Sequence, residues 1–127
     1  MLHEEITSKI IKAFYKVYNT LGYGFMEKVY ENALLIELKK EGFNVEQQKL
    51  IKVYYEGEVV GDYYADIFVE DLVILELKAC ESLHDAHKSQ LINYLKATGK
   101  EVGLLLNFGK DAEVKRVLNN KQKNIEY

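Results

Sequence analysis

Two charged residues in the middle of the chain have the types and spacing of a catalytic site. Glu76 and Lys78 are two positions apart within residues 72–79, a segment that is otherwise apolar. In a β-strand, residues two apart project from the same face. Burying a charged side chain without a partner or a metal ion is costly, so this pair indicates a polar site inside the protein. The alternative is a plain ion pair at the end of the strand.

Asp66 lies in the preceding predicted strand and can supply a second carboxylate. A hairpin can bring Asp66 beside Glu76, and two such carboxylates can hold Mg²⁺ or Mn²⁺. A two-residue loop at residues 70–71 would pair Asp66 with Leu75 and turn the carboxylates to opposite faces of the sheet. The metal hypothesis therefore requires a loop with an odd number of residues, such as 70–72, or a β-bulge.

The surrounding sequence predicts the helices and strands that must position these residues. Apolar residues recur at helical spacing in residues 4–20, 26–40 and 84–98. Segments rich in β-branched, aromatic and other apolar residues predict strands at 45–55, 58–69, 72–79 and 102–107, with a tight turn at Glu56-Gly57.

The order of these elements predicts a mixed sheet. Residues 72–79 are apolar on both faces before Glu76, which is typical of a central strand. A strand, a helix and a second buried strand follow one another from residue 72 to residue 107, which predicts a parallel pair of strands. Residues 112–118 fit either a short helix or an edge strand.

Composition sets limits on the class of protein. The chain has 127 residues, which fits one domain over residues 1–127, and no apolar run approaches the ~20 residues needed to cross a bilayer. The single cysteine, Cys80, excludes a disulfide within the chain. We expect a cytoplasmic protein without membrane contact. The formal net charge of −3 argues mildly against nucleic-acid binding, although lysines cluster locally near both ends.

Several motifs together resemble a known family. Residues 24–30, GFMEKVY, match the Gly-x-x-Glu-x-x-Tyr signature of the GxxExxY proteins, and the resemblance continues through Asp66, residues 76–78, 90–95 and 103–109. That family is similar to a compact branch of the PD-(D/E)xK nuclease superfamily. The resemblance implies an α/β fold of the restriction-endonuclease-like type, with an αβββαβ core and a mixed central sheet flanked by helices.

The resemblance also implies roles for individual residues. Asp66 and Glu76 would bind Mg²⁺ or Mn²⁺, with the Leu77 carbonyl completing the inner shell and Glu27 as a further ligand, directly or through water. Lys78 would position or activate the attacking water and stabilise charge on the phosphate. The chain departs from the family at Tyr64, where an arginine is expected two residues before the aspartate.

Three further residues are candidates for substrate contacts. Tyr30 lies three positions after Glu27 and shares its helix face, where it can hydrogen-bond within the site. Gln90 and Tyr94 are four positions apart on the third predicted helix and share a face. Gln90 is also a candidate catalytic residue because it can orient Lys78 or a phosphate, whereas Tyr94 can equally be a core residue.

Other chemistry-bearing residues have simpler explanations. His84 and His87 have helical spacing that suits a metal ion, but no third nitrogen or sulfur ligand is nearby in sequence, so we expect at most that His87 lies near the site. The tyrosines 54, 55, 63 and 64 could stack nucleic-acid bases or form an interface, although packing across the hairpin is the expected role.

Three functions remain open from the sequence. The first is a Mg²⁺- or Mn²⁺-dependent nuclease that hydrolyses phosphodiester bonds, of DNA rather than RNA. The second is a non-catalytic relative that keeps the fold and binds nucleic acid or a protein partner. The third is a phosphoesterase that acts on a small nucleotide. Because a domain of this size has limited surface for a duplex, we also expect a homodimer.

Overall fold

The computed structural model describes residues 3–119, which form three helices and five strands. In chain order these elements are α1 (Glu4–Leu21), α2 (Glu27–Lys40), β1 (Val45–Tyr55), β2 (Glu58–Val69), β3 (Val73–Lys78), α3 (Asp85–Thr98), β4 (Val102–Phe108) and β5 (Ala112–Leu118). Each predicted helix and strand is present, with bounds that differ by one residue at most at either end. Residues 112–118, for which two structures were open, form a strand.

The five strands form one mixed sheet in the order β1-β2-β3-β4-β5. β3 and β4 are parallel, as the intervening helix predicts, and the other neighbouring pairs are antiparallel. β3 is the central strand, and its residues from Val73 to Leu77 are all buried. The core αβββαβ order expected from the resemblance corresponds to α2 through β4, to which α1 and β5 are added.

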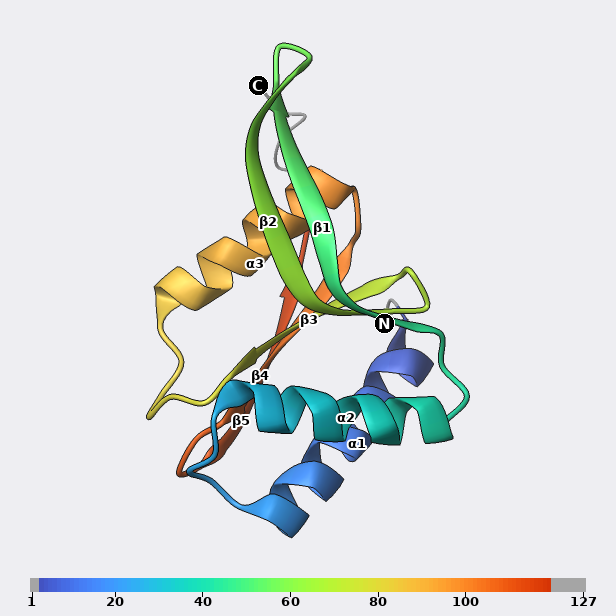
Figure 1. The fold of residues 1–127 in the computed structure, drawn as a ribbon, viewed down its shortest axis with the longest axis vertical. Coiled ribbons are helices and arrows are strands. Elements are labelled where there is room, and N and C mark those ends of the chain that lie inside the picture. The colour runs from blue at the N-terminus through green and yellow to red at the C-terminus, as the bar shows by residue number, and fades with distance from the viewer. Residues whose placement is uncertain (1–2, 120–127) are drawn as a thin grey trace.

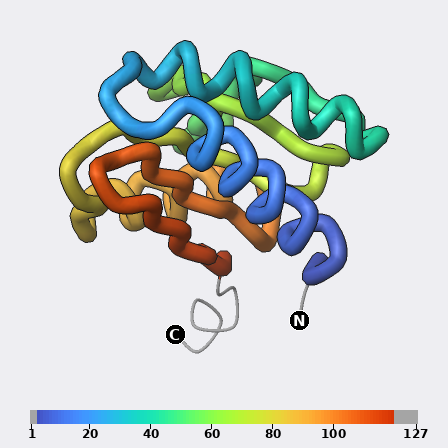
Figure 2. Tube along the Cα trace, turned by 90° about the horizontal axis from the view of Figure 1, so that it is seen from below, coloured from blue at the N-terminus to red at the C-terminus, as the bar shows by residue number. Residues whose placement is uncertain are grey.

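Helices cover both faces of this sheet (Figures 1 and 2). α1 and α2 pack against each other on one face, and α3 packs on the opposite face. Side chains from β3 alternate between the two cores, since Val73 and Leu75 belong to the core under α1 and α2 while Ile74 belongs to the core under α3.

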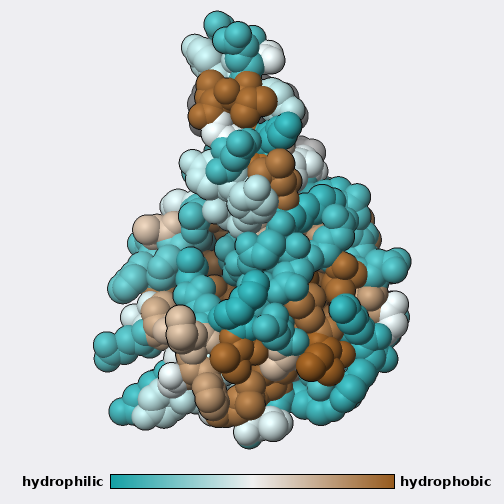
Figure 3. Space-filling model, in the orientation of Figure 1, coloured by the Kyte–Doolittle hydropathy of each residue, from teal (hydrophilic) through white to brown (hydrophobic). Residues whose placement is uncertain are grey.

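The β1–β2 hairpin is much longer than the rest of the sheet and projects beyond it (Figure 1). β2 pairs with β3 only through residues 67–69, so most of the hairpin has no other strand beside it. Glu56 and Gly57 make the predicted tight turn at its tip, both with positive φ. Hydrophobic side chains lie on the surface of the projecting part (Figure 3), where Val59 and Val60 are exposed.

None of the helices within residues 3–119 combines the length and the apolar character that crossing a membrane requires.

Candidate functional site

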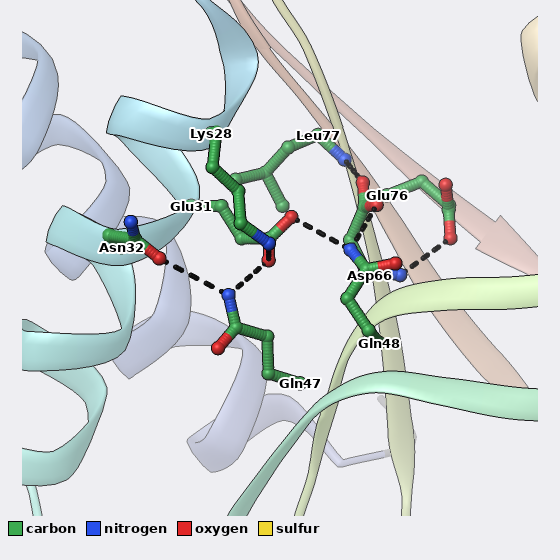
Figure 4. Close-up of polar contacts among 8 residues, drawn as sticks. All are labelled: Lys28, Glu31, Asn32, Gln47, Gln48, Asp66, Glu76 and Leu77. Atoms are coloured by element: carbon green, nitrogen blue, oxygen red, sulfur yellow. Dashed lines mark hydrogen bonds and ion pairs between the residues drawn. The ribbon is translucent and has the colours of Figure 1, made fainter.

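Asp66 and Glu76 lie side by side where β2 and β3 meet (Figure 4). Three residues, 70–72, connect the paired residues Val69 and Val73, so the loop has the odd length that the metal hypothesis requires. The backbone N–H of Asp66 donates to Glu76 Oε1 at 3.1 Å, and the N–H of Leu77 donates to Asp66 Oδ2 at 2.7 Å. Each carboxylate is therefore held by the backbone of the opposite strand.

The strand β2 is irregular at Asp66, because the side chains on either side of this residue point to opposite faces of the sheet. Ala65 packs in the core under α3, whereas Ile67 packs in the core under α1 and α2. Residues two apart in a regular strand would share a face. Gln48, across from Asp66 on β1, has a positive φ of 53° and no registered pair, so both strands are irregular here. Asp66 therefore has no paired residue on either neighbouring strand, and its backbone N–H is left to bond Glu76.

Burial makes both carboxylic acids hard to ionise in the protein alone. The Glu76 side chain is 6% exposed, and its burial, followed by the nearby charge of Asp66, raises the pKa of Glu76 to about 8. The pKa of Asp66 is raised as well, chiefly by burial, although the Leu77 N–H opposes this. A cation placed between these groups would favour their charged forms.

Glu31 is a third acidic residue near the pair, and the sequence reasoning missed it. It is buried on α2, where it accepts hydrogen bonds from Lys28 Nζ at 3.0 Å, from Gln48 Nε2 at 3.0 Å and from Gln47 Nε2. Gln48 Nε2 also lies 3.3 Å from Asp66 Oδ1, so this amide links the two carboxylates (Figure 4). The signal in the sequence was the position of Glu31 on the helix face that is otherwise apolar.

Glu27 and Lys78 lie around the same pair without hydrogen-bonding to it. Glu27 is exposed at the start of α2, and its charge raises the pKa of both Asp66 and Glu76. Lys78 is half-buried, and its ammonium makes no hydrogen bond or ion pair with the residues that the structure describes. Its charge lowers the pKa of Glu76 in opposition to burial. The ammonium of Lys78 is therefore available to a substrate.

Tyr30, a candidate for substrate contact, has a different position from the one expected. Its side chain is fully buried and stacks on Phe108, with 4.3 Å between ring centroids. Its hydroxyl donates to the Gly22 carbonyl at 2.7 Å and accepts from the Phe25 N–H at 3.2 Å. Tyr30 fixes the loop before α2 because both hydrogen-bonding directions of its hydroxyl are used there.

The α3 candidates lie on the face of the sheet that α3 covers. Tyr94 is buried, and its pKa is raised to about 12 by burial and by the charge of Glu76. Gln90 is exposed one turn earlier on the same helix. His87 accepts a hydrogen bond from the His84 N–H through Nδ1, and its pKa is lowered by burial and by Lys78, which places it near the site.

Asn107 holds the end of β3, a role for its side chain that the sequence reasoning missed. It is fully buried and pairs with Lys78 across the parallel strands. Its amide receives the Cys80 N–H at 3.0 Å and donates to the Cys80 carbonyl at 2.9 Å. At Gly109 an added Cβ would lie 2.2 Å from that carbonyl, so only glycine fits. These contacts fix the chain just after Lys78.

The donor set fits a hard divalent cation that keeps most of its water. No group of three or more His, Cys, Asp and Glu side chains within residues 3–119 is arranged to hold a metal ion. Mg²⁺ commonly binds through only one or two protein carboxylates plus water and substrate phosphate, and Asp66 with Glu76 supplies two. Because burial raises the pKa of both acids, a bound cation would offset the cost of ionising them.

Comparisons with known proteins identify relatives of this fold. A family model described as the PD-(D/E)XK nuclease superfamily matches residues 4–117. No curated protein sequence matches the chain.

Two solved structures are similar to this fold, one over most of the chain and the other over nearly all of it. The protein SSO0001 has a TM-score of 0.59 and 22% identity over 72% of this chain, which spans about half, 48%, of the length of that protein. The alkaline exonuclease LHK-Exo from Laribacter hongkongensis has a TM-score of 0.56 and 11% identity over 99% of this chain and 75% of its own. At these identities, the likeness shows a shared fold.

Proposed function

Because the chain belongs to the PD-(D/E)XK nuclease superfamily, we propose that it is a nuclease that uses Mg²⁺ or Mn²⁺ to hydrolyse phosphodiester bonds of DNA in preference to RNA. The observation that supports this function best is the pair of facing carboxylates, Asp66 and Glu76, with the unpaired ammonium of Lys78 on the same strand as Glu76. A plain Glu–Lys ion pair would have joined Glu76 to Lys78 instead.

The proposed roles follow from where each residue lies. Asp66 and Glu76 would hold the cation, with the Leu77 carbonyl as a further ligand, and Glu27 would act through water from its exposed position on α2. A bound divalent cation supplies positive charge that activates water and stabilises a phosphorane-like transition state. Lys78 would orient the attacking water and stabilise the negative charge that develops on the phosphate oxygens. Gln90 would orient a phosphate from α3.

Glu31 supports the carboxylate pair indirectly, through Gln48. Its carboxylate binds Gln48 Nε2, and the same nitrogen contacts Asp66 Oδ1, so Glu31 would fix the orientation of Asp66 as a positioning residue. Lys28 offsets the charge of Glu31 at 3.0 Å. The site therefore has a second layer of polar contacts that does not need to touch the cation.

We also propose that the chain belongs to the GxxExxY branch, because the glycine and the tyrosine of this signature have structural roles in the loop before α2. Gly24 has a φ of +111°, which L-residues with a side chain rarely adopt. Tyr30 binds the backbone of this loop through Gly22 and Phe25. Together the glycine and the tyrosine set the start of α2, and Glu27 lies at that start.

A cleavage assay tests the proposed function. Labelled single- and double-stranded DNA and RNA are incubated with the wild type, Glu76→Ala and Lys78→Ala, each with Mn²⁺, Mg²⁺ or EDTA. We expect cleavage only with the cations, and a loss of about a hundredfold or more in both variants. Glu101→Gln, an exposed acid at the start of β4, is the matched control and should cleave like the wild type. Equal cleavage by the wild type and Glu76→Ala would contradict the assignment.

A further inference from the structure

A groove of about 1010 Å³ lies between the projecting hairpin and α3. The hairpin contributes Lys52, Tyr54 and Tyr63 to its lining, and α3 contributes Gln90, Asn93 and Lys96 among others. The carboxylate pair is not part of this lining. Tyr94 and Gln90, however, line the groove. Tyr94 packs in the same core as Ile74, which lies two residues before Glu76 on the same face of β3, so the groove leads toward the carboxylates.

We propose that this groove binds an unpaired strand of nucleic acid and directs it to the carboxylate site. The inference deepens the proposed function and rests on it for the direction of the strand. It adds a substrate class, single-stranded nucleic acid or the single-stranded end of a duplex, and it assigns the residues that bind the strand before the reacting phosphate.

Aromatic rings on the groove are placed to stack with bases. Tyr54 is 61% exposed and Tyr63 is 46% exposed, although both line the groove. The ring of Tyr63 contacts the ring of Tyr94 at a tilt, with 5.5 Å between centroids. Tyr63 is therefore held in place by α3 while much of its side chain stays exposed to solvent. Base stacking on tyrosine requires bases that are not stacked in a duplex, which favours a single strand.

The groove is lined by positive charge, which suits a polyanion, whereas the chain as a whole has a net negative charge. The whole sequence has 20 acidic and 17 basic residues, yet among residues 3–119 the lining contains two lysines and no Asp or Glu. Neither Lys52 nor Lys96 forms an ion pair with any residue in that range. Both ammonium groups are therefore available to phosphates, and the side-chain amides of Gln90 and Asn93 can hydrogen-bond to base edges.

The tyrosines of the hairpin provide matched controls. Tyr54 and Tyr63 line the groove, whereas Tyr55 and Tyr64 are 67% and 58% exposed and do not. All four are on the same two strands, so a role in hairpin stability alone would not separate the two pairs. Lys88 is an exposed lysine of α3 outside the lining and serves as the control for charge.

Fluorescence anisotropy with the full chain in EDTA tests the proposal without cleavage. The probes are labelled oligothymidylate and oligouridylate of about twelve nucleotides and a duplex of equal length. We expect single strands to bind more tightly than the duplex. Tyr54→Ala should weaken binding about tenfold, and Tyr54→Phe should restore it because the stacking face is kept. Tyr55→Ala should change binding by less than about twofold.

The lysines are tested by the salt dependence of the same binding. Lys52→Glu and Lys96→Glu should each weaken binding and reduce its dependence on salt concentration, since each removes one phosphate contact. Lys88→Glu should leave that dependence closer to the wild-type value. Equal binding by Tyr54→Ala, Lys52→Glu and the wild type would overturn the proposal, as would preference for the duplex. A dimer that dissociates in Tyr54→Ala would assign the groove to a second copy of the chain instead.

Failure of the groove and failure of the nuclease are distinguishable. If the groove variants lose binding but the wild type cleaves nothing with Mn²⁺, then the groove binds nucleic acid and the proposed catalysis is wrong. If the wild type cleaves and Tyr54→Ala binds and cleaves equally well, then the catalysis stands and the groove is not the binding site.

Discussion

Glu76 is the residue on which burial and chemistry conflict most strongly. Its carboxyl group lies among apolar neighbours at 6% exposure, next to the carboxyl group of Asp66. In the absence of a cation, this environment raises the pKa of Glu76 to about 8, so the acid keeps its proton at neutral pH. A protein that needed only stability would not retain an acid here, whereas a metal site needs one.

Metal-free protein should therefore lose stability as pH rises. The folded pKa of Glu76, about 8, lies above its ordinary value of 4.5, so the folded state binds a proton that the unfolded state has released. The stabilisation that this bound proton gives is fully present below about pH 4.5 and is lost as pH rises through about 8. The free energy of unfolding should fall by roughly a few kcal/mol over this range. Denaturant unfolding in EDTA across this range measures it. Glu76→Gln, which cannot titrate, should reduce this slope and leave only the part that the raised pKa of Asp66 contributes, and an unchanged slope would contradict the prediction.

The helix α3 is positioned by close packing on β4. Gly103 of β4 faces Leu91 of α3, and a Cβ at Gly103 would lie 2.9–3.0 Å from three atoms of the Leu91 side chain. Because Gly103 has no side chain, α3 can approach the sheet there. The same helix carries Gln90, which lies next to Leu91, and Tyr94. The geometry of the site and of the groove therefore depends on this contact.

A pair of substitutions tests that contact. Gly103→Ala should lower the free energy of unfolding by about 1–3 kcal/mol through overpacking. Leu91→Ala should lower it by about 2–5 kcal/mol through a cavity. The double variant should lose less than the sum, by on the order of 1 kcal/mol, because the new methyl group occupies part of the cavity. Denaturant unfolding measures all three.

Gly61→Ala in β2 is the control for these substitutions, since its Cβ would make only ordinary contacts of 3.5 and 4.0 Å. A strictly additive double variant would show that Gly103 and Leu91 are not in contact.

The molecule as a whole has two cores on opposite faces of one sheet. Leu34 lies in the core under α1 and α2, and Leu95 lies in the core under α3. β3 supplies buried side chains to both, so neither core can lose its packing without exposing the other face of the same strand. We propose that the chain is one cooperative domain.

Unfolding should then occur in a single transition. Far-ultraviolet circular dichroism reports on helices and strands, and near-ultraviolet signals report on the packing of the ten tyrosines. The two midpoints should coincide. Leu34→Ala and Leu95→Ala should each shift the same transition, by about 2–5 kcal/mol. Two resolved transitions, each sensitive to one variant only, would show separate folding units.

The local structure and the main candidate residues of the site could be predicted from the sequence alone. Periodicity marked each helix and strand because a side chain's face follows from its spacing alone. The odd loop length that the metal hypothesis requires is present, since three residues connect Val69 and Val73 and leave Asp66 and Glu76 on one side of the hairpin. Sequence could not decide whether residues 112–118 form a strand, because an edge strand exists only through its partner, here β4.

Which polar residues support the site, and which lie elsewhere, depends on contacts that form only in the folded protein. Glu31 is buried beside Gln48, and Tyr30 is buried against Phe108, although both residues lie on the same helix as Glu27. Spacing shows which face of an element is covered but not what covers it, and burial energies depend on that covering. The groove has the same origin, because its two walls are separated by more than twenty residues of chain and meet only in the folded protein.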